Sequence, residues 1–153
     1  MITGDDVQLV TFRVGEQEFA FDILQVERIL RYARPSSVPK APAFLEGVLP
    51  FERGVIPVVD LRKRLDATAG VGEETRVVVI SIESERVGVV VDEVREVLRV
   101  DASVISAPPA IVRGLAAEYI TGVAHVDERT IVLLNARRLF SGTERLTLSR
   151  AGS

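Results

Sequence analysis

Hydrophobic and polar residues alternate in short runs along this chain, and the runs stop at turn-forming residues. Residues 8–14 (QLVTFRV) alternate and end at Gly15, whose freedom to adopt a positive φ suits a hairpin turn before the apolar residues 19–21. Residues 76–82 and 87–91, separated by a short polar segment, repeat this hairpin. The alternation predicts β-strands as the main elements.

The apolar runs at 77–80, within the second hairpin, and at 131–134 are short and rich in β-branched residues. This composition favours strands that are covered on both faces. Helices are expected to be few. Short helices are predicted at 60–65 and 135–140, because each segment starts with an N-cap residue type and gathers basic residues toward its C-terminal end.

The chain contains an internal repeat. The stretch GVIPVVDLRKRL at 54–65 returns 75 positions later as RTIVLLNARRLF at 129–140, without a gap. A second match, at a slightly smaller offset, pairs VERILR at 26–31 with VREVLR at 94–99. Two matches in the same order along the chain indicate a duplicated unit.

Two halves of similar topology are therefore expected, at about residues 7–65 and 75–141, forming one domain together. The segment DATAGVG at 66–72 is the predicted linker, and the ends, at 1–6 and 142–153, are expected to be flexible. Short strands with turns about every ten residues favour a mostly β fold made of two small barrels packed together.

Composition narrows the function classes. The formal net charge of −3 over 153 residues removes the attraction on which binding to nucleic acids or anionic membrane surfaces depends. The absence of cysteine excludes disulfides and thiol catalysis, and the single histidine, His125, leaves a transition-metal site with too few ligands. An acidic N-terminus and the lack of an apolar run of about 20 residues argue against a secretion signal or a membrane span. We expect a cytosolic protein.

Motifs of the common enzyme classes are absent. The sequence has no phosphate-binding GxxxxGKS/T, no dinucleotide-binding GxGxxG, no zinc-binding HExxH and no GxSxG nucleophile motif. Carboxylates are plentiful, but a catalytic pair also requires a cleft that shifts the pKa of one of them. We expect no enzymatic activity and no cofactor.

Four stretches, taken in their order and spacing, resemble the CheW family, the small adaptors of bacterial chemotaxis whose fold is also found as the regulatory domain of CheA histidine kinases. They are FAFDILQVERIL (19–30), PAFLEGV with GVIPVVDLRKRL (42–65), VGVVVDEVREVL (87–98) and YITGVAHVDERTIVLLNARRLF (119–140). The resemblance rests on the set, because none of the four is specific alone. It implies two intertwined five-stranded SH3-like barrels with a few short helices, a hydrophobic groove between the barrels, and no active site.

The resemblance also implies partners. Such adaptors couple transmembrane chemoreceptors to a CheA-type histidine kinase: the cytoplasmic tip of the receptor lies in the groove, and the outer surfaces of the barrels meet the kinase's regulatory domain. The protein would be cytoplasmic, recruited peripherally to receptor arrays, and would bias the kinase's conformation through contacts. Exposed edge strands could also pair between copies into weak oligomers or rings.

A second interpretation of the resemblance is a divergent interaction module. Such a module would bind only one of the two partners, or would serve a chemosensory pathway that controls surface motility or pili. An enzyme or a ligand-binding barrel is a more distant alternative, distinguished by whether a small molecule raises the melting temperature.

The candidates for partner binding are Val26, Arg28, Ile29, Glu52, Arg53, Arg62 and Val97. The apolar residues among them could either fill the cores or line the groove, and the resemblance favours the groove for Val26 and Val97. Arg62 could face a partner, but its recurrence as Arg137 in the second half favours a structural role.

Four residues are expected to serve the structure itself. Asp60 is expected to cap the short helix that follows it. Gly47, Gly88 and Gly122 are expected to provide backbone geometry or close packing.

Two charged positions depart from the family pattern. In the family, the stretch after the GV of PAFLEGV reads close to NLRG, with an arginine important for receptor coupling, and an acid is usual near the start of the VERIL segment. Aligned without gaps, Glu52 holds the arginine's place and Arg28 the acid's. One hypothesis is that Arg28 and Glu52 form an ion pair of reversed polarity, which would alter partner choice. The alternative is a shift by one residue, which puts Arg53 where the family's arginine acts.

Overall fold

The computed structural model describes residues 6–65, 67, 70–108 and 117–151, and their main elements are β-strands. The strands are β1 (Asp6–Val14), β2 (Gln17–Asp22), β3 (Val26–Arg31), β4 (Leu45–Phe51), β5 (Gly54–Asp60), β6 (Arg76–Ile82), β7 (Glu85–Val91), β8 (Glu93–Asp101), β9 (Ile105–Ser106), β10 (Ile120–Val126) and β11 (Arg129–Leu134). The helices are α1 (Leu61–Arg64) and α2 (Gly142–Ala151), with 3₁₀ turns η1 (Ile23–Gln25), η2 (Ala102–Val104), η4 (Ala117–Tyr119) and η5 (Ala136–Arg138).

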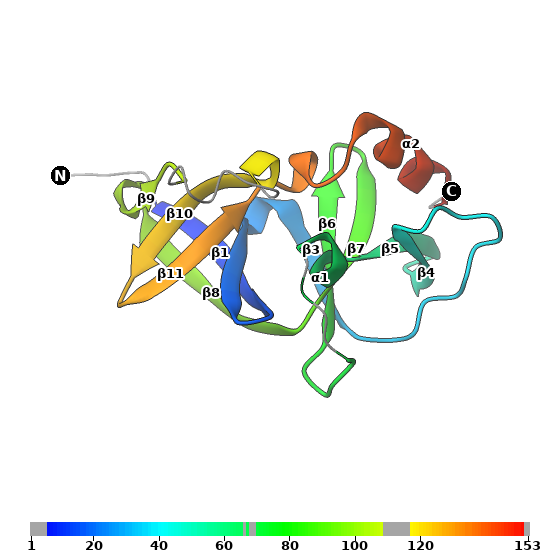
Figure 1. Cartoon of the computed structure of the whole chain (residues 1–153), viewed down its shortest axis with the longest axis horizontal. Helices are drawn as coiled ribbons and strands as arrows, with labels where there is room; N and C mark the ends of the chain where they lie inside the picture. Colours follow the sequence, from blue (N-terminus) through cyan, green and yellow to red (C-terminus); the bar gives the residue numbers. More distant parts are fainter. Residues whose placement is uncertain (1–5, 66, 68–69, 109–116, 152–153) are drawn as a thin grey trace.

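The strands form two sheets that lie side by side along the long axis of the molecule (Figure 1). One sheet has the order β8-β1-β2-β11-β10-β9, and the other has the order β3-β6-β7-β5-β4. We call the first sheet, with its two-residue strand β9, the first barrel and the other sheet the second barrel. The fold is mostly β, as the sequence predicts.

Each barrel contains strands from both halves of the sequence. β1 and β2 of the first half pair with β8 and β11 of the second half, while β6 and β7 of the second half pair with β3 and β5 of the first. The pairings are equivalent: β2–β11 and β5–β7 are parallel, whereas β1–β8 and β3–β6 are antiparallel. The duplicated units have therefore exchanged their first two strands.

Local signals in the sequence give the expected turns and caps. Gly15 has φ +61° in the turn between β1 and β2. The Asp60 carboxylate caps α1 by accepting a hydrogen bond from the Arg62 N–H at 3.0 Å. The Asn135 side chain caps η5 in the same way, from the Arg137 N–H at 2.9 Å. Both predicted caps are confirmed, and each ends a strand by starting a helical turn.

The largest hydrophobic cluster is shared by the two barrels. Phe12 and Phe21 from the first barrel pack in it with Ile80 and Val89 from the second, and all four are fully buried. Each barrel also has a smaller cluster of its own. Burying one large apolar side chain stabilises a fold by about 1.5–3 kcal/mol, so we expect the shared cluster to make the two barrels unfold together.

The segment after Gly142 differs from the flexible tail that the sequence predicts, because residues 142–151 form α2. Leu148 is buried in the shared core, and the Arg64 guanidinium donates two hydrogen bonds to Glu144, at 3.1 and 2.9 Å. Ser141 and Glu144 form a capping box, in which each side chain accepts the other's backbone N–H. The pattern S-x-x-E was present in the sequence, but a single buried leucine gives little periodic signal.

The remaining predicted flexible residues fall mainly outside the described part of the chain. Residues 1–5 and 152–153 are not among the described residues, and Asp6 already belongs to β1. The predicted linker at 66–72 is described only in part.

Gly47 in β4 sits where another residue would not fit. Its φ is +148°, and a Cβ atom built on it would lie 2.2 Å from the Ser36 carbonyl oxygen. Ser36 is held there by two backbone hydrogen bonds with Val48, each 2.9 Å long. The position therefore requires glycine for both its conformation and the close approach of a second backbone segment.

We expect Gly47→Ala to lower the free energy of unfolding by about 1–3 kcal/mol, because it adds both strain and a backbone clash. The measurement is urea denaturation followed by circular dichroism. Gly54→Ala is the matched control, since a Cβ atom at Gly54 meets nothing within 4 Å. It should stay within about 0.5 kcal/mol of the wild type. Equal losses in the two variants would contradict this explanation.

The docking of α2 should depend on pH. Burial raises the pKa of Glu144, but hydrogen bonds from Arg64 and the Ser141 N–H outweigh it, so the pKa lies below its ordinary value of 4.5. A carboxyl whose pKa is lower in the folded state stabilises the fold above its unfolded pKa. This contribution is lost as the pH falls through about 4.5 toward the folded pKa.

The wild type should therefore lose more of its free energy of unfolding than Glu144→Gln when the pH falls from about 6 to about 3. Urea titrations at a series of pH values measure this difference. Glu118→Gln, which removes an exposed carboxylate nearby, is the control and should keep the wild-type pH dependence. A Glu144→Gln profile parallel to that of the wild type would refute the assigned role of this carboxylate.

Candidate functional site

The most exposed strand surfaces lie on β3 and β8, which are edge strands of the two sheets. Three consecutive residues are exposed on each: Glu27, Arg28 and Ile29 on β3, and Arg95, Glu96 and Val97 on β8. In the sequence repeat these triplets occupy equivalent positions. An edge strand has one row of backbone groups that its own sheet does not pair, which makes it a natural place for another chain to bind.

The apolar candidates on these strands divide into two groups. Ile29 and Val97 are 41% and 53% exposed, whereas Val26 and Val94 are half-buried against the shared core. The two equivalent strands therefore both turn their first valine inward and a later β-branched residue outward. Ile29 and Val97 are the side chains available to a partner.

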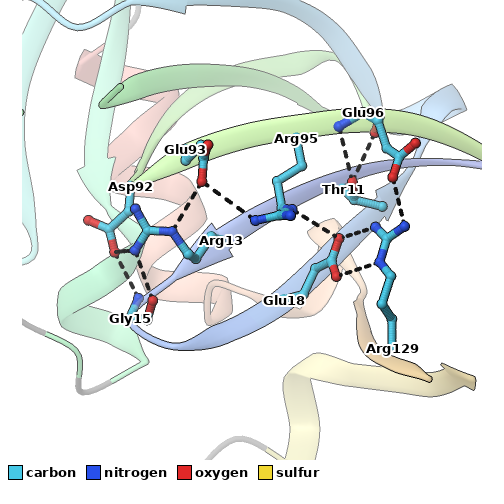
Figure 2. Close-up of polar contacts among 9 residues, drawn as sticks. All are labelled: Thr11, Arg13, Gly15, Glu18, Asp92, Glu93, Arg95, Glu96 and Arg129. Atoms are coloured by element: carbon cyan, nitrogen blue, oxygen red, sulfur yellow. Dashed lines mark hydrogen bonds and ion pairs between the residues drawn. The ribbon is translucent and has the colours of Figure 1, made fainter. Parts of the chain in front are cut away.

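A charge network holds β8 against its neighbours in the first barrel (Figure 2). Arg129 of β11 forms ion pairs with Glu18 of β2 and, at 2.7 Å, with Glu96 of β8. Arg95 lies 3.7 Å from carboxylate oxygens of both Glu18 and Glu93. The hydrogen bonds that Arg129 donates to Glu18 and then to Glu96 raise the pKa of Arg129 above its ordinary value. Every charged side chain at 93, 95 and 96 thus has an internal partner.

The same network is anchored to β1. The Thr11 hydroxyl donates to the Glu96 carbonyl at 3.0 Å and accepts from the Glu96 N–H at 3.2 Å, beside an irregularity in the β1–β8 register. Arg13 donates to Glu93 at 3.2 Å. Figure 2 shows these contacts running along the strand. Partly exposed ion pairs each contribute only about 0–1 kcal/mol, so together they mainly fix the position of β8.

The charged side chains near β3 are arranged around an aromatic ring, that of Phe51. The Arg28 and Arg86 guanidinium groups both stack on Phe51, with their carbons 5.4 and 5.1 Å from the ring centre. Arg86, on β7, also forms ion pairs with Glu27 and with Glu52. The predicted Arg28–Glu52 ion pair is therefore wrong: Glu52 is occupied by Arg86, and Arg28 packs on the aromatic ring.

Glu52 and Arg53 are the two residues of the turn between β4 and β5, where Phe51 pairs with Gly54. Glu52 has φ +53°, an uncommon conformation for a residue other than glycine or asparagine. Both side chains are exposed at the same end of the second barrel and line one surface hollow with Phe51 and Arg86.

Arg62 lies in the interior, only 5% exposed, and so is not positioned to contact a partner. Its guanidinium donates to both oxygens of Asp60, at 2.9 and 3.0 Å, and to Asp92 at 3.1 Å. The hydrogen bonds to Asp60, followed by those to Asp92, raise the pKa of Arg62. Arg62 is therefore held within the fold, where Asp92, from a distant part of the sequence, also pairs with its charge.

This buried cluster connects the two barrels. Asp60 ends β5 of the second barrel, while Asp92 lies at the chain crossing between β7 and β8. The second oxygen of Asp92 accepts the backbone N–H of Gly15, in the β1–β2 turn of the first barrel, at 2.7 Å. Arg62 also donates to the Gly70 carbonyl at 3.0 Å. The cluster therefore bridges both barrels and the segment that follows α1.

The other two glycines expected to be structural are tightly surrounded. A Cβ atom at Gly88 would lie 2.7 Å from Val77 Cγ1, inside the second barrel. At Gly122 it would lie 2.9 Å from both Ile105 Cγ2 and the Ser106 carbonyl oxygen. Both contacts give a physical reason for a residue without a side chain.

Within the described residues, no group of three or more potential ligands could hold a metal ion. In the same part of the chain, no helix is long and apolar enough to cross a membrane. The features described above are exposed strand edges, apolar side chains and preorganised charges. Two strand-exchanged barrels that present such edges define a protein-binding scaffold.

Comparison with known proteins places this scaffold in a family. A model described as "CheW-like domain" matches residues 8–144. The chain therefore belongs to the CheW family, whose members are scaffold proteins of chemotaxis.

Relatives and a solved structure agree with this assignment. The chain is 31% identical over 148 residues to the chemotaxis protein CheW of Treponema pallidum, covering 94% of this chain and 87% of the relative. It is 34% identical over 147 residues to CheW of Klebsiella aerogenes, covering 94% and 88%, and 31% identical over 142 residues to protein FrzA of Myxococcus xanthus, covering 91% and 88%. The crystal structure of the scaffolding protein TtCheW from Thermoanaerobacter tengcongensis matches with a TM-score of 0.82 at 28% identity, covering 88% of this chain and 92% of that one.

The buried cluster predicts a large difference between two neighbouring residues of α1. Arg62→Met should lower the free energy of unfolding by about 3–5 kcal/mol, because it leaves Asp60 and Asp92 buried without a counter-charge. Lys63→Met should cost at most about 1 kcal/mol, because the Lys63 side chain is 63% exposed and its pair with Glu46 is a surface contact. Urea denaturation of both variants measures the difference, and similar losses would contradict the role given to the cluster.

Proposed function

We propose that this chain is a non-enzymatic adaptor that couples chemoreceptors to a CheA-type histidine kinase in bacterial chemosensory signalling. The observation that carries the proposal is the matched pair of exposed apolar residues, Ile29 and Val97, on equivalent edge strands of the two barrels. Membership of the CheW family supplies the class of pathway.

The receptor's cytoplasmic tip is the partner proposed for the β3 and β8 surface. A helical hairpin presents apolar side chains flanked by charges, and β3 and β8 offer the same combination. The kinase's regulatory domain is proposed to contact the outer surfaces of the barrels. Simultaneous contact with both partners would let the receptor bias the kinase's conformation.

The proposed working place is the cytoplasmic face of receptor arrays, where the protein is held by its partners. The proposal includes no cofactor and no nucleic acid, in keeping with a net charge of −3. We further propose that the two halves and α2 form one domain, because the shared core includes Leu148 of α2.

A second candidate function is a divergent module that binds one of these partners or serves another chemosensory pathway. The observation that favours it is the reversed charge in the β4–β5 turn, where Glu52 is occupied by an ion pair with Arg86. Under this alternative, the receptor tip and the kinase domain would not both bind.

The test is to measure binding of a soluble receptor-tip hairpin and of the kinase's regulatory domain, both from the same genome, separately and together. Ile29→Asp and Val97→Asp should each weaken binding of the hairpin by about tenfold or more, because they place a charge in an apolar contact. Leu146→Asp is the matched control: Leu146 is also an exposed apolar residue, but it lies on α2. Binding of neither partner, or equal weakening by Leu146→Asp, would refute the proposal.

A further inference from the structure

The exposed triplets of β3 and β8 carry charges in opposite order. β3 presents Glu27, Arg28 and Ile29, where β8 presents Arg95, Glu96 and Val97. Each triplet ends in an exposed β-branched residue, so both strands offer an apolar side chain at the same position. The acidic and basic residues before it stand in opposite order on the two strands. The difference lies in what each charged side chain already contacts.

On β8 the two charges of the triplet are neutralised within the protein. Glu96 pairs with Arg129, and Arg95 lies near Glu18 and Glu93 (Figure 2). On β3, Glu27 pairs with Arg86. Within the described part of the chain, the Arg28 side chain makes no ion pair or hydrogen bond. Arg28 is thus the one member of the two triplets whose charge has no counter-charge among the described residues.

Phe51 holds the Arg28 guanidinium at the surface. The ring is itself buried, and the guanidinium carbon lies 5.4 Å from its centre. A cation placed on an aromatic face is held in one region without losing its charge, which lowers the entropy cost of a later contact. Arg28 is therefore both charged and positioned.

The acids nearest to this cluster do not neutralise Arg28. Glu27 and Glu52 are both taken by Arg86, which stacks on the same ring at 5.1 Å. One ring thus carries two guanidinium groups but only one of them is compensated. The uncompensated group is on β3, the edge strand that also carries the exposed Ile29 and that is proposed above to contact the receptor.

We propose that Arg28 determines receptor specificity by pairing with an acidic side chain on the receptor tip, where the tip runs along the edge strand that also carries Ile29. This inference rests on the function proposed above and adds to it the charge of the partner residue. A carboxylate on the receptor would give Arg28 the counter-charge that Arg95 and Glu96 of β8 already have inside the protein. A receptor tip with a basic residue at that place would be rejected by like-charge repulsion.

The experiment measures the affinity of the soluble receptor-tip hairpin for the full chain and for three variants. Arg28→Glu should weaken binding by about tenfold or more, because it turns attraction into repulsion, while Arg28→Lys should fall in between, since it keeps the charge but loses the planar stack. Arg31→Glu is the matched control: it makes the same change of charge on an exposed residue of β3, but Arg31 stacks on no ring in the described structure. It should weaken binding by less than about threefold.

A second arm changes the hairpin. Its acidic residues are replaced by lysine one at a time, and one replacement should weaken binding to the wild type while restoring binding to Arg28→Glu. Thermal unfolding of each variant checks that the fold is intact, which is expected because the Arg28 side chain is exposed.

The outcomes separate this inference from the proposed function. If the wild type does not bind the hairpin, both are overturned. If the wild type binds it and Arg28→Glu weakens binding no more than Arg31→Glu, or no lysine replacement restores binding, the inference alone is overturned. Selective weakening by Arg28→Glu together with restoration by one replacement supports it.

Discussion

The exchange of strands between the two halves of the sequence is the constraint on which the rest of the structure depends. Each barrel takes two strands from one half and its remaining strands from the other, so neither half contains a complete sheet. The shared core and the buried Arg62 cluster then form at the junction that the exchange creates. The buried charges there would be costly without partners, but Arg62 forms ion pairs with both Asp60 and Asp92.

This constraint also determines where the proposed binding surface lies. β3 and β8 are the strands that follow each crossing between barrels, and both become edges because the exchange pairs them only with β6 and β1. Their equivalent positions give equivalent exposed residues, Ile29 and Val97, from two remote parts of the sequence. Their charged residues stand in opposite order, and each acid pairs with an arginine of a neighbouring strand, Glu96 with Arg129 of β11 and Glu27 with Arg86 of β7. Under the proposed function, duplication provides two equivalent apolar contacts, and the different charges beside them make the binding selective.

Features set by neighbouring residues could be predicted from the sequence. The hairpins and the caps at Asp60 and Asn135 depend on short patterns and were predicted correctly. Features that depend on contacts between residues far apart in the sequence could not be predicted. The predicted Arg28–Glu52 pair failed because Arg86, 34 positions beyond Glu52, takes the acid, and Arg62 is enclosed by Asp92, 30 positions away. The helix α2 was missed for a different reason: its capping box was visible, but its stability comes from packing on the shared core.

The most direct test of this account is to produce the two halves as separate chains, divided in the segment between Leu65 and Arg76, and to follow their folding by circular dichroism and thermal unfolding. Each half alone should lack a cooperative transition, because it holds only part of each sheet, and mixing the halves should restore the native spectrum and one transition. If either half folds cooperatively on its own, the barrels do not depend on strand exchange, and the central claim is wrong.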